Sequence, residues 1–262
     1  MDFVNFEVGS KTISLAILNI LLTEQYRNNL TEVPNNNPNF LGAKEFMNVP
    51  VPIFDLGRIL NNRSTKEFNL KTIEQLQFHK QSLNNWFDST SNQSSSYEPV
   101  VFKKWLESFN SQDSDLSIAL SKIAESIEIL LAKASKRGAV QSDENIEISK
   151  VLTKINQLFD SAIEHIEYTY KPIIIFTTID DRNPHVGLLV DKVKDNIHVK
   201  ETDIKGLDSV TSVGFDLENE TKAMLKGLIQ LEGKHSLIID PAALFKLPDS
   251  DSIKLSDLSQ TA

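Results

Sequence analysis

The sequence predicts an α+β protein in which two β-rich flanks enclose an inserted antiparallel helical bundle. Glycine and proline give the first indication, because both residues punctuate turns and are rare inside helices. Between Gly57 and Gly187 the chain has one glycine, and between Pro52 and Pro172 it has one proline. The predicted divisions are residues 1–62 and 171–247 for the two halves of the β-rich body, 63–170 for the helical insert and 248–262 for a polar tail.

A unit that occurs twice relates the two flanks. One apolar run ends in Asp55, a second ends in Asp240, and each is followed by a short helical turn. Gly42 lies thirteen positions before Asp55, and Gly227 lies thirteen positions before Asp240. Two copies of one unit are the simplest explanation. Both aspartates are predicted to cap the turn that follows, which is a structural role.

The first flank is predicted to consist mainly of strands. Apolar residues alternate on both sides of Gly9, as in a hairpin. The expected elements are a hairpin over 3–17, a short helix over 18–22, an irregular loop over 33–39 and a strand over 41–47. Pro50 and Pro52 restrict the next strand to an edge or a bulge, because proline cannot donate to a ladder.

From Lys66 onward the apolar period changes to that of helices. Three stripes are expected to face one another: Ile73, Leu76, Leu83 and Phe87; Leu116, Leu120, Ile123, Ile127, Leu130 and Leu131; and Ile148, Leu152, Ile155, Phe159, Ala162 and Ile166. The 4-3-4-3-4 spacing of the third stripe is typical of a left-handed bundle. In an alternative interpretation, this stripe drives dimerisation instead. A short helix over 100–106 would pack Phe102 and Trp105 inward.

The second flank is again predicted to be β-rich. Strands are expected over 173–176, 186–191 and 193–199, a polar loop over 201–220, and the second copy of the repeated unit over 224–245.

Composition excludes several classes of function. Lys+Arg number 27 against 36 Asp+Glu, giving a formal net charge of −9, so nucleic acid is an unfavourable partner. The absence of cysteine excludes disulfides, thiolate catalysis and cysteine-ligated zinc. Neither a secretory signal nor a membrane-spanning run is found, so a cytoplasmic protein without direct membrane insertion is expected.

No catalytic constellation stands out. The sequence has no phosphate-loop, dinucleotide or zinc-protease motif. Four of the five histidines are scattered along the chain: His165, His185, His198 and His235. Catalysis needs a base aimed at a reacting group. The prediction is therefore no enzyme activity and no cofactor.

Several spaced motifs of the flanks resemble the CheW-like domain of bacterial chemotaxis coupling proteins. Pro34, Gly42 and the run Pro52–Leu56 match a motif of the first half of that family. Val186–Asp191, and the stretch from Lys226-Gly227 to Asp240, match the second half. The resemblance implies two small β-barrels, one from each flank, and a non-enzymatic adaptor that binds chemoreceptor cytoplasmic tips and a CheA-type histidine kinase at receptor arrays.

The resemblance places candidate partner contacts at Leu30, Glu32, Val33 and Met47. Met47-Asn48 stands where the family has an arginine-glycine pair. A thioether cannot make the bidentate contacts of a guanidinium group. Met47 therefore changes whatever contact the arginine makes, either partner recognition or bracing between the barrels.

The helical insert resembles the chemoreceptor zinc-binding (CZB) bundle. Phe102–Leu106 is similar to its aromatic segment, and His79 is similar to its first zinc ligand. The other ligands are missing, because Val100, Ala124 and Glu128 occupy their positions. A closed zinc site needs about four ligands, so a degenerate site without metal is predicted, with His79 as its retained residue.

Two further hypotheses belong to other classes. In the first, the protein is a sensor whose helical insert binds a small ligand or residual metal at His79 and relays occupancy through the barrels. In the second, the protein is a homodimer formed through the helical insert.

Overall fold

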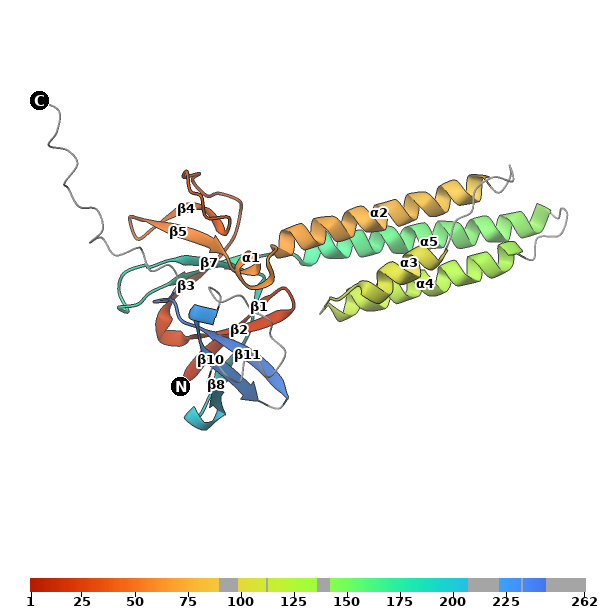
Figure 1. Cartoon of the computed structure of the whole chain (residues 1–262). Coiled ribbons are helices and arrows are strands. Elements are labelled where there is room, and N and C mark those ends of the chain that lie inside the picture. The colour runs from red at the N-terminus through yellow and green to blue at the C-terminus, as the bar shows by residue number, and fades with distance from the viewer. Residues whose placement is uncertain (90–98, 112, 136–141, 207–221, 232, 244–262) are drawn as a thin grey trace, which may run out of the picture. The chain divides into compact units, whose positions relative to one another are not determined.

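The computed structural model describes residues 1–89, 99–111, 113–135, 142–206, 222–231 and 233–243. The chain forms two compact units (Figure 1). The sheet unit contains Met1–Asn62 and Pro172–Ala262, and the helical unit contains Arg63–Lys171. The protein is thus mixed α+β, as predicted.

The sheet unit holds two sheets. Sheet A has the order β8 (Lys192–His198), β1 (Asp2–Val8), β2 (Lys11–Ala16), β11 (Lys234–Ile239), β10 (Leu225–Leu231) and β9 (Ile204–Lys205). Sheet B has the order β3 (Ile20–Gln25), β6 (Ile173–Thr177), β7 (Gly187–Val190), β5 (Val49–Asp55) and β4 (Phe40–Phe46). Neighbours are antiparallel except β2 with β11 and β5 with β7, which are parallel.

This topology corrects the prediction of one barrel from each flank. Each sheet takes strands from both flanks, so residues 1–62 and 171–247 do not fold into separate barrels. Neither sheet closes by backbone pairing within the described part of the chain, where β8 and β9 are the edges of sheet A and β3 and β4 those of sheet B.

The strands nevertheless form two repeats of the same order. The first repeat is β1 to β5, and the second is β6, β7, β8, β10 and β11. In each repeat the last strand pairs in parallel with the second strand of the other repeat. Each repeat therefore contributes its first hairpin, β1–β2 or β6–β7, to the sheet built mainly by the other.

Irregularities in the ladders recur at corresponding positions. The register shifts at Gly42 between β4 and β5 and at Gly227 between β10 and β11. It also shifts once between β3 and β6 and once between β1 and β8. Asp55 and Asp240 each donate their backbone N–H to the residue sixteen positions earlier, at 2.8 and 2.9 Å. These matches confirm the two predicted copies of one unit.

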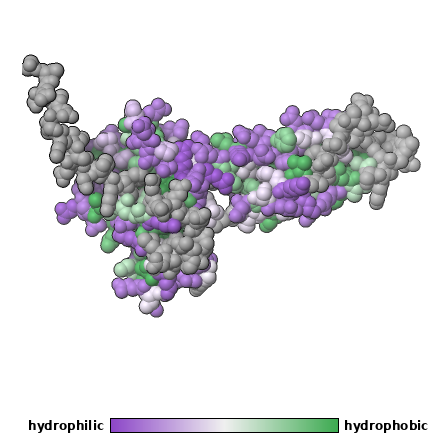
Figure 2. Space-filling view, viewed as in Figure 1, coloured by the Kyte–Doolittle hydropathy of each residue, from purple (hydrophilic) through white to green (hydrophobic). Residues whose placement is uncertain are grey.

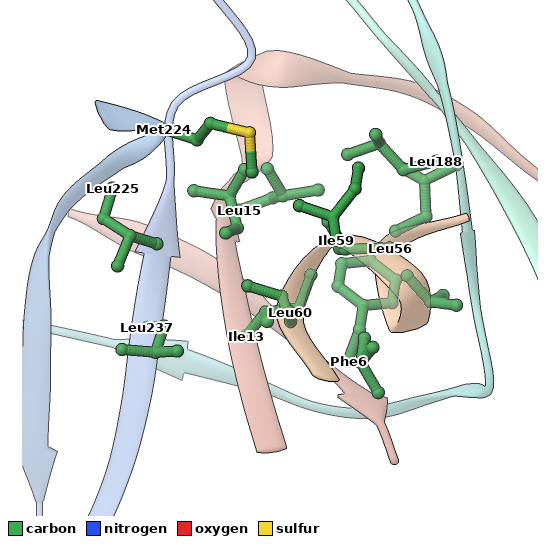
Figure 3. Close-up of a cluster of buried hydrophobic side chains, with 14 of the residues drawn as sticks. Phe6, Ile13, Leu15, Leu56, Ile59, Leu60, Leu188, Met224, Leu225 and Leu237 are labelled. Carbon is green, nitrogen blue, oxygen red and sulfur yellow. The ribbon is translucent and has the colours of Figure 1, made fainter. Parts of the chain in front are cut away.

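A central core lies between the two sheets. It buries Phe6, Ile13 and Leu15 from sheet A, Leu188 from sheet B, and side chains of α1 (Leu56–Asn61) (Figure 3). The opposite face of each sheet has its own smaller core: Phe3, Val199, Ile229 and Ile238 on sheet A, and Val51, Ile53, Ile174, Phe176 and Leu189 on sheet B. The alternation of side chains along the strands explains why each sheet is buried on both faces.

Both aspartates of the repeated unit hold turns. Asp55 caps α1, because its Oδ1 accepts the backbone N–H of Arg58 at 3.1 Å. Asp240 Oδ1 accepts the N–H of Ala242 at 3.1 Å in the turn after β11. The predicted structural role is confirmed for Asp55, and Asp240 makes the corresponding turn contact.

Two local predictions for the first flank need correction. The expected helix over 18–22 is a 3-10 turn, Ile17–Asn19, followed by strand β3, because pairing with β6 outweighs the local pattern. The two prolines restrict only half of β5, since β7 pairs solely with Ile53–Asp55. Pro50 and Pro52 therefore lie where β4 is the only neighbour, and the rest of β5 is internal.

The helical unit contains α2 (Thr65–Ser89), α3 (Pro99–Ser108), α4 (Ser114–Ser135) and α5 (Ser142–Thr169). Helix α5 runs antiparallel to α2, because Lys80 pairs with Asp160 and Asn84 exchanges amide hydrogen bonds with Asn156. All six residues of the third predicted stripe are buried in the core of this unit. That stripe is thus internal, which corrects the alternative in which it forms a dimer seam.

Some predictions fall on other parts of the chain. The tail over 248–262 and most of the loop over 201–220 lie outside the described residues. In the described part, no helix has both the length and the apolar character needed to cross a membrane.

Candidate functional site

Met47 lies at the tip of the β4–β5 hairpin with a strained backbone. Phe46 pairs with Val49, so Met47 and Asn48 are the two turn residues, with φ of 54° and 61°. Two positive φ values are typical of a type I′ turn, which favours asparagine and glycine. A methionine in this region costs about 1 kcal/mol. Its side chain is 58% exposed, so burial does not offset that cost.

The other three candidate residues lie along a segment beside β4. Thr31 forms an antiparallel bridge with Ala43, which fixes the neighbouring residues. Leu30 packs against the core of sheet B, whereas Glu32 and Val33 are exposed. This segment is therefore held by both backbone pairing and apolar contact.

The structure does not bring all four candidates into one patch. Because the bridge is antiparallel, the chain after Thr31 runs towards the start of β4, and Met47 lies beyond its other end. Met47 is four residues past Ala43, which corresponds to about 13 Å along a strand. Val33 and Met47 are thus separate points on one side of sheet B.

An ion pair helps to fix this side of sheet B. Lys44 on β4 bonds Glu24 on β3, so side chains link the first and the last strand in the order of sheet B. Lys44 Nζ also lies 3.4 Å from Asn29 Oδ1, beside the candidate segment. The corresponding positions of the second repeat, Ile197 and Ile229, lie in the apolar core of sheet A. The polar link is therefore particular to sheet B.

Exposed apolar side chains concentrate on sheet B. Nine large apolar side chains of the described sheet unit are exposed, and seven belong to sheet B or adjoin its strands. These seven are Ile17, Leu18, Leu22, Val33, Met47, Val49 and Ile179. The view in Figure 2 shows a mainly hydrophilic surface with separate hydrophobic areas on the sheet unit.

Leu18 and Ile179 are exposed apolar residues, in two segments joined by hydrogen bonds, that the sequence did not reveal. Asn19 and Thr178 share two hydrogen bonds, of 3.0 and 3.2 Å, next to the last rung of the β3–β6 ladder. Leu18, in the 3-10 turn Ile17–Asn19, directly precedes Asn19, and Ile179 directly follows Thr178; the two residues are 75% and 56% exposed. In the second repeat the position of Leu18 is taken by Asp191, whose carboxylate accepts the Gly9 N–H at 2.6 Å.

The turn that carries Ile179 is rigid. Asp180 Oδ1 accepts the backbone N–H groups of Asn183 and Arg182 at 2.8 and 3.0 Å, and the Thr178 hydroxyl at 3.0 Å. Hydrogen bonds from Asn183, and then from Arg182, lower the pKa of the Asp180 carboxyl. An ionised carboxylate therefore stabilises the turn in which Ile179 lies.

The zinc-ligand candidate His79 is buried among aromatic rings. Its side chain is 2% exposed, and neither ring nitrogen has a hydrogen-bond partner among the described residues. The rings of Phe78, Phe102 and Trp105 lie 5.0 to 5.5 Å from it, centroid to centroid. Desolvation by this apolar surrounding lowers the pKa of His79 from 6.5 to about 4.

The residues present do not fit a zinc ion. At the positions where the CZB resemblance expects further ligands, Glu128 pairs with Lys103 at 3.5 Å, and Ala124 packs against the helical core. The side chain of Val100 lies outside the described set. Across the described ranges, no group of three or more His, Cys, Asp or Glu side chains could hold a metal ion.

The other histidines do not form a catalytic arrangement with one another. His165 Nε2 bonds Asp113 at 2.8 Å, and His198 Nδ1 bonds Asp2 at 2.6 Å. The Nε2 atoms of His185 and His235 are buried without a hydrogen-bond partner in the described part of the chain. These four side chains lie on different segments of the chain, and the two that form hydrogen bonds do so with different aspartates.

Stability of the helical unit is expected to fall as the pH drops from 6.5 towards 4. In this pH range His79 is protonated in the unfolded chain but neutral in the folded one. A fall in pH therefore favours unfolding. The loss should reach about 3 kcal/mol and should level off below the folded pKa. Urea unfolding followed by tryptophan fluorescence measures it, because Trp86 and Trp105 both lie in the helical unit.

His79→Leu is the matched variant for this test. It removes the unsatisfied nitrogens at similar volume and should raise stability at pH 7 by about 1–3 kcal/mol. The difference in free energy of unfolding between wild type and variant should decrease as the pH rises and become constant above pH 7. Equal pH slopes for the two proteins between pH 4 and 6.5 would contradict the assignment to His79.

Comparisons with known proteins leave the family of this chain open. No protein-family model matches the chain, and neither does any curated protein. Among solved structures, the chain is similar to the crystal structure of the scaffolding protein TtCheW from Thermoanaerobacter tengcongensis. The two have 13% sequence identity and a TM-score of 0.42, over 91% of this chain and 88% of that chain. The function of this chain is therefore inferred from its own residues.

Proposed function

We propose that the protein is a non-enzymatic adaptor that binds partner proteins through the exposed apolar side chains of sheet B. The carrying observation is Met47, an exposed apolar residue in a conformation that disfavours it. Strain without a compensating internal contact is a feature of binding sites, where a partner supplies the contact. Exposed apolar side chains that gather on one sheet support the same conclusion.

The two repeats can be compared in their hairpin turns and in their exposed apolar side chains. Gly233, with φ of 77°, occupies the place of Asn48 in the β10–β11 turn, and the place of Met47 falls on residue 232, outside the described residues. On the described strands alone, sheet B exposes two large apolar side chains, Leu22 and Val49, and sheet A exposes one, Val193. A feature found in one repeat alone is not required by the fold that the two repeats share, and this supports a role in partner binding for the exposed apolar side chains of sheet B.

The proposed partners are chemoreceptor cytoplasmic tips and a CheA-type histidine kinase. This choice follows the likeness of the Pro52–Leu56 and Val186–Asp191 motifs to CheW-like coupling domains. Leu30, Glu32 and Val33 are proposed as a second contact, separate from Met47. Glu32 is exposed and offers a carboxylate to a basic partner group. Residues 63–170 are proposed as a module inserted into this adaptor.

Met47→Asn is expected to weaken partner binding about tenfold while stabilising the sheet unit by about 0.5–1 kcal/mol. Asparagine accepts a positive φ, so the turn is kept and only the thioether contact is lost. Calorimetric titration of the full chain with a receptor-tip fragment, and separately with a CheA regulatory domain, measures the affinity.

Val193→Asn is the matched control, because it removes an exposed apolar side chain from sheet A. It should leave the affinity unchanged. Wild-type protein that binds neither partner from its own organism, or equal losses from the two variants, would overturn the proposal.

A further inference from the structure

Helix α1 is placed where the two sheets meet. Leu56, Ile59 and Leu60 are buried in the central core (Figure 3). There they pack with side chains of sheet A, such as Phe6, and of sheet B, such as Leu188. Any displacement of α1 therefore acts on the packing between the sheets, because protein cores have little free volume.

Both ends of α1 are attached to strands or turns of the sheet unit. Its first turn continues directly from β5 through the Asp55 cap. At its last turn, Lys11 Nζ donates a hydrogen bond to Leu60 O, and Asn61 Nδ2 donates to Val8 O at 3.2 Å. Lys11 and Val8 flank the β1–β2 turn of sheet A. The burial that accompanies this contact lowers the pKa of Lys11.

Only three residues separate α1 from the helical unit's first helix. Helix α1 ends at Asn61 and α2 begins at Thr65. Ser64 is already fixed to α2 by a capping box: Glu67 N donates to Ser64 Oγ, and Ser64 N donates to Glu67 Oε2, both at 2.9 Å. Asn62 ends α1 in the left-handed conformation. The connection is thus short and held at each end.

The return connection is equally short and enters sheet B directly at β6. Helix α5 ends at Thr169 and β6 begins at Ile173. Pro172 O accepts the Tyr26 N–H at 3.0 Å and the Gln25 side-chain amide at 2.9 Å, which ties this connection to the β3 end of sheet B. The outgoing connection leads instead from the core between the sheets.

We propose that α1 is a conformational link that passes changes in the helical unit into the packing between sheet A and sheet B. A shift of α2 relative to α5 changes the distance between Thr65, where α2 begins, and Thr169, where α5 ends. Short connections join both of these residues to the sheet unit. The return end is fixed on sheet B, so the displacement is taken up by α1. The helical unit thereby regulates the relation between the sheets, including the surface on sheet B.

The test perturbs the helical core far from both connections and reads the response at α1. Leu120 on α4 is fully buried in that core and belongs to neither connection. In the full chain, Leu120→Ala should increase hydrogen exchange tenfold or more for the amides of α1 and for those of β2 and β7. Tryptophan fluorescence confirms that the helical unit has been perturbed, because the chain's two tryptophans lie there.

Ile123→Val is the milder variant should Leu120→Ala prevent folding, since it removes one methylene from an equally buried position. It should give a smaller response of the same pattern. A change in tryptophan fluorescence with no change in α1 exchange, for either variant that folds, would overturn the proposal.

An inserted Gly-Gly-Ser-Gly segment between Arg63 and Ser64 supplies the uncoupled protein. It lengthens the outgoing connection while leaving the contacts of α1 and the capping box of α2 available. In this background the exchange response of α1 to Leu120→Ala should disappear. The same insertion between Asn35 and Asn36, in an exposed loop, is the matched control and should leave the response intact. Equal responses in the two insertion proteins would contradict a link through α1.

Discussion

Gly42→Ala is expected to destabilise the sheet unit by about 3–5 kcal/mol. A Cβ at Gly42 would lie 2.7 Å from the carbonyl oxygen of Thr31, which is backbone and cannot rotate away. Its φ of 139° lies in a region that other residues rarely adopt. Steric overlap and backbone strain therefore add at one position. Hydrogen exchange of β4 and β5 amides in the intact chain measures the loss.

Three other glycines separate the two causes. Gly227 has the close contact without the positive φ, because its Cβ would lie 2.5 Å from Lys205 O, and about 1–3 kcal/mol is expected for Gly227→Ala. Gly233 has φ of 77° and open space, so about 1 kcal/mol is expected. Gly206 has neither feature and should change stability by less than about 0.5 kcal/mol. A Gly42→Ala effect no larger than that of Gly206→Ala would show that the bridge between Thr31 and β4 is not formed.

Phe159→Ala is expected to destabilise the helical unit by about 3–5 kcal/mol. Phe159 on α5 is fully buried, and its ring meets that of Phe102 edge to face at 5.7 Å. Truncation leaves a cavity between α5 and α3 that neighbouring helices fill only partly. Because Phe102 also contacts Trp105 at 5.5 Å, tryptophan fluorescence should report both the unfolding transition and a changed native spectrum.

Ile129→Ala is the matched control for Phe159→Ala. Ile129 is more than half exposed on α4, so its truncation should cost less than about 0.5 kcal/mol. Similar losses for the two variants would mean that α5 does not bury its stripe inside the chain, and would restore the interpretation in which that stripe joins two copies.

The periodicity of the sequence predicted most types of elements, with 18–22 as an exception, but not the exchange of strands between the sheets. The alternation of apolar residues in 3–17 predicts two strands, and this pattern is the same whichever sheet receives the hairpin. Since the two repeats have matching strands, either partner satisfies the pattern. The sheet that each hairpin joins is seen only in the long-range pairing, such as that of Leu237 with Ile13. The local sequence pattern does not contain this pairing.

The candidate site was foreseen unevenly for physical reasons. Met47 was found because a motif departs there, while its positive φ depends on the two-residue turn that pairing creates. Leu18 and Ile179 were missed, because exposed and buried apolar residues look alike in a β-rich pattern. The burial of His79 could have been predicted from the sequence. Its spacing from Leu76 and Leu83 places it on the first helical stripe.

The exchange of hairpins sets the order in which the chain folds during its synthesis. Sheet B lacks two strands until Val190 has left the ribosome, and sheet A is incomplete until Ile239 has done so. The helical unit needs only Arg63–Lys171, so we expect it to fold before the sheet unit is complete. Until the second flank has been synthesised, the strands of the first flank have unpaired edges. We expect a chaperone that covers such edges to matter most during this interval.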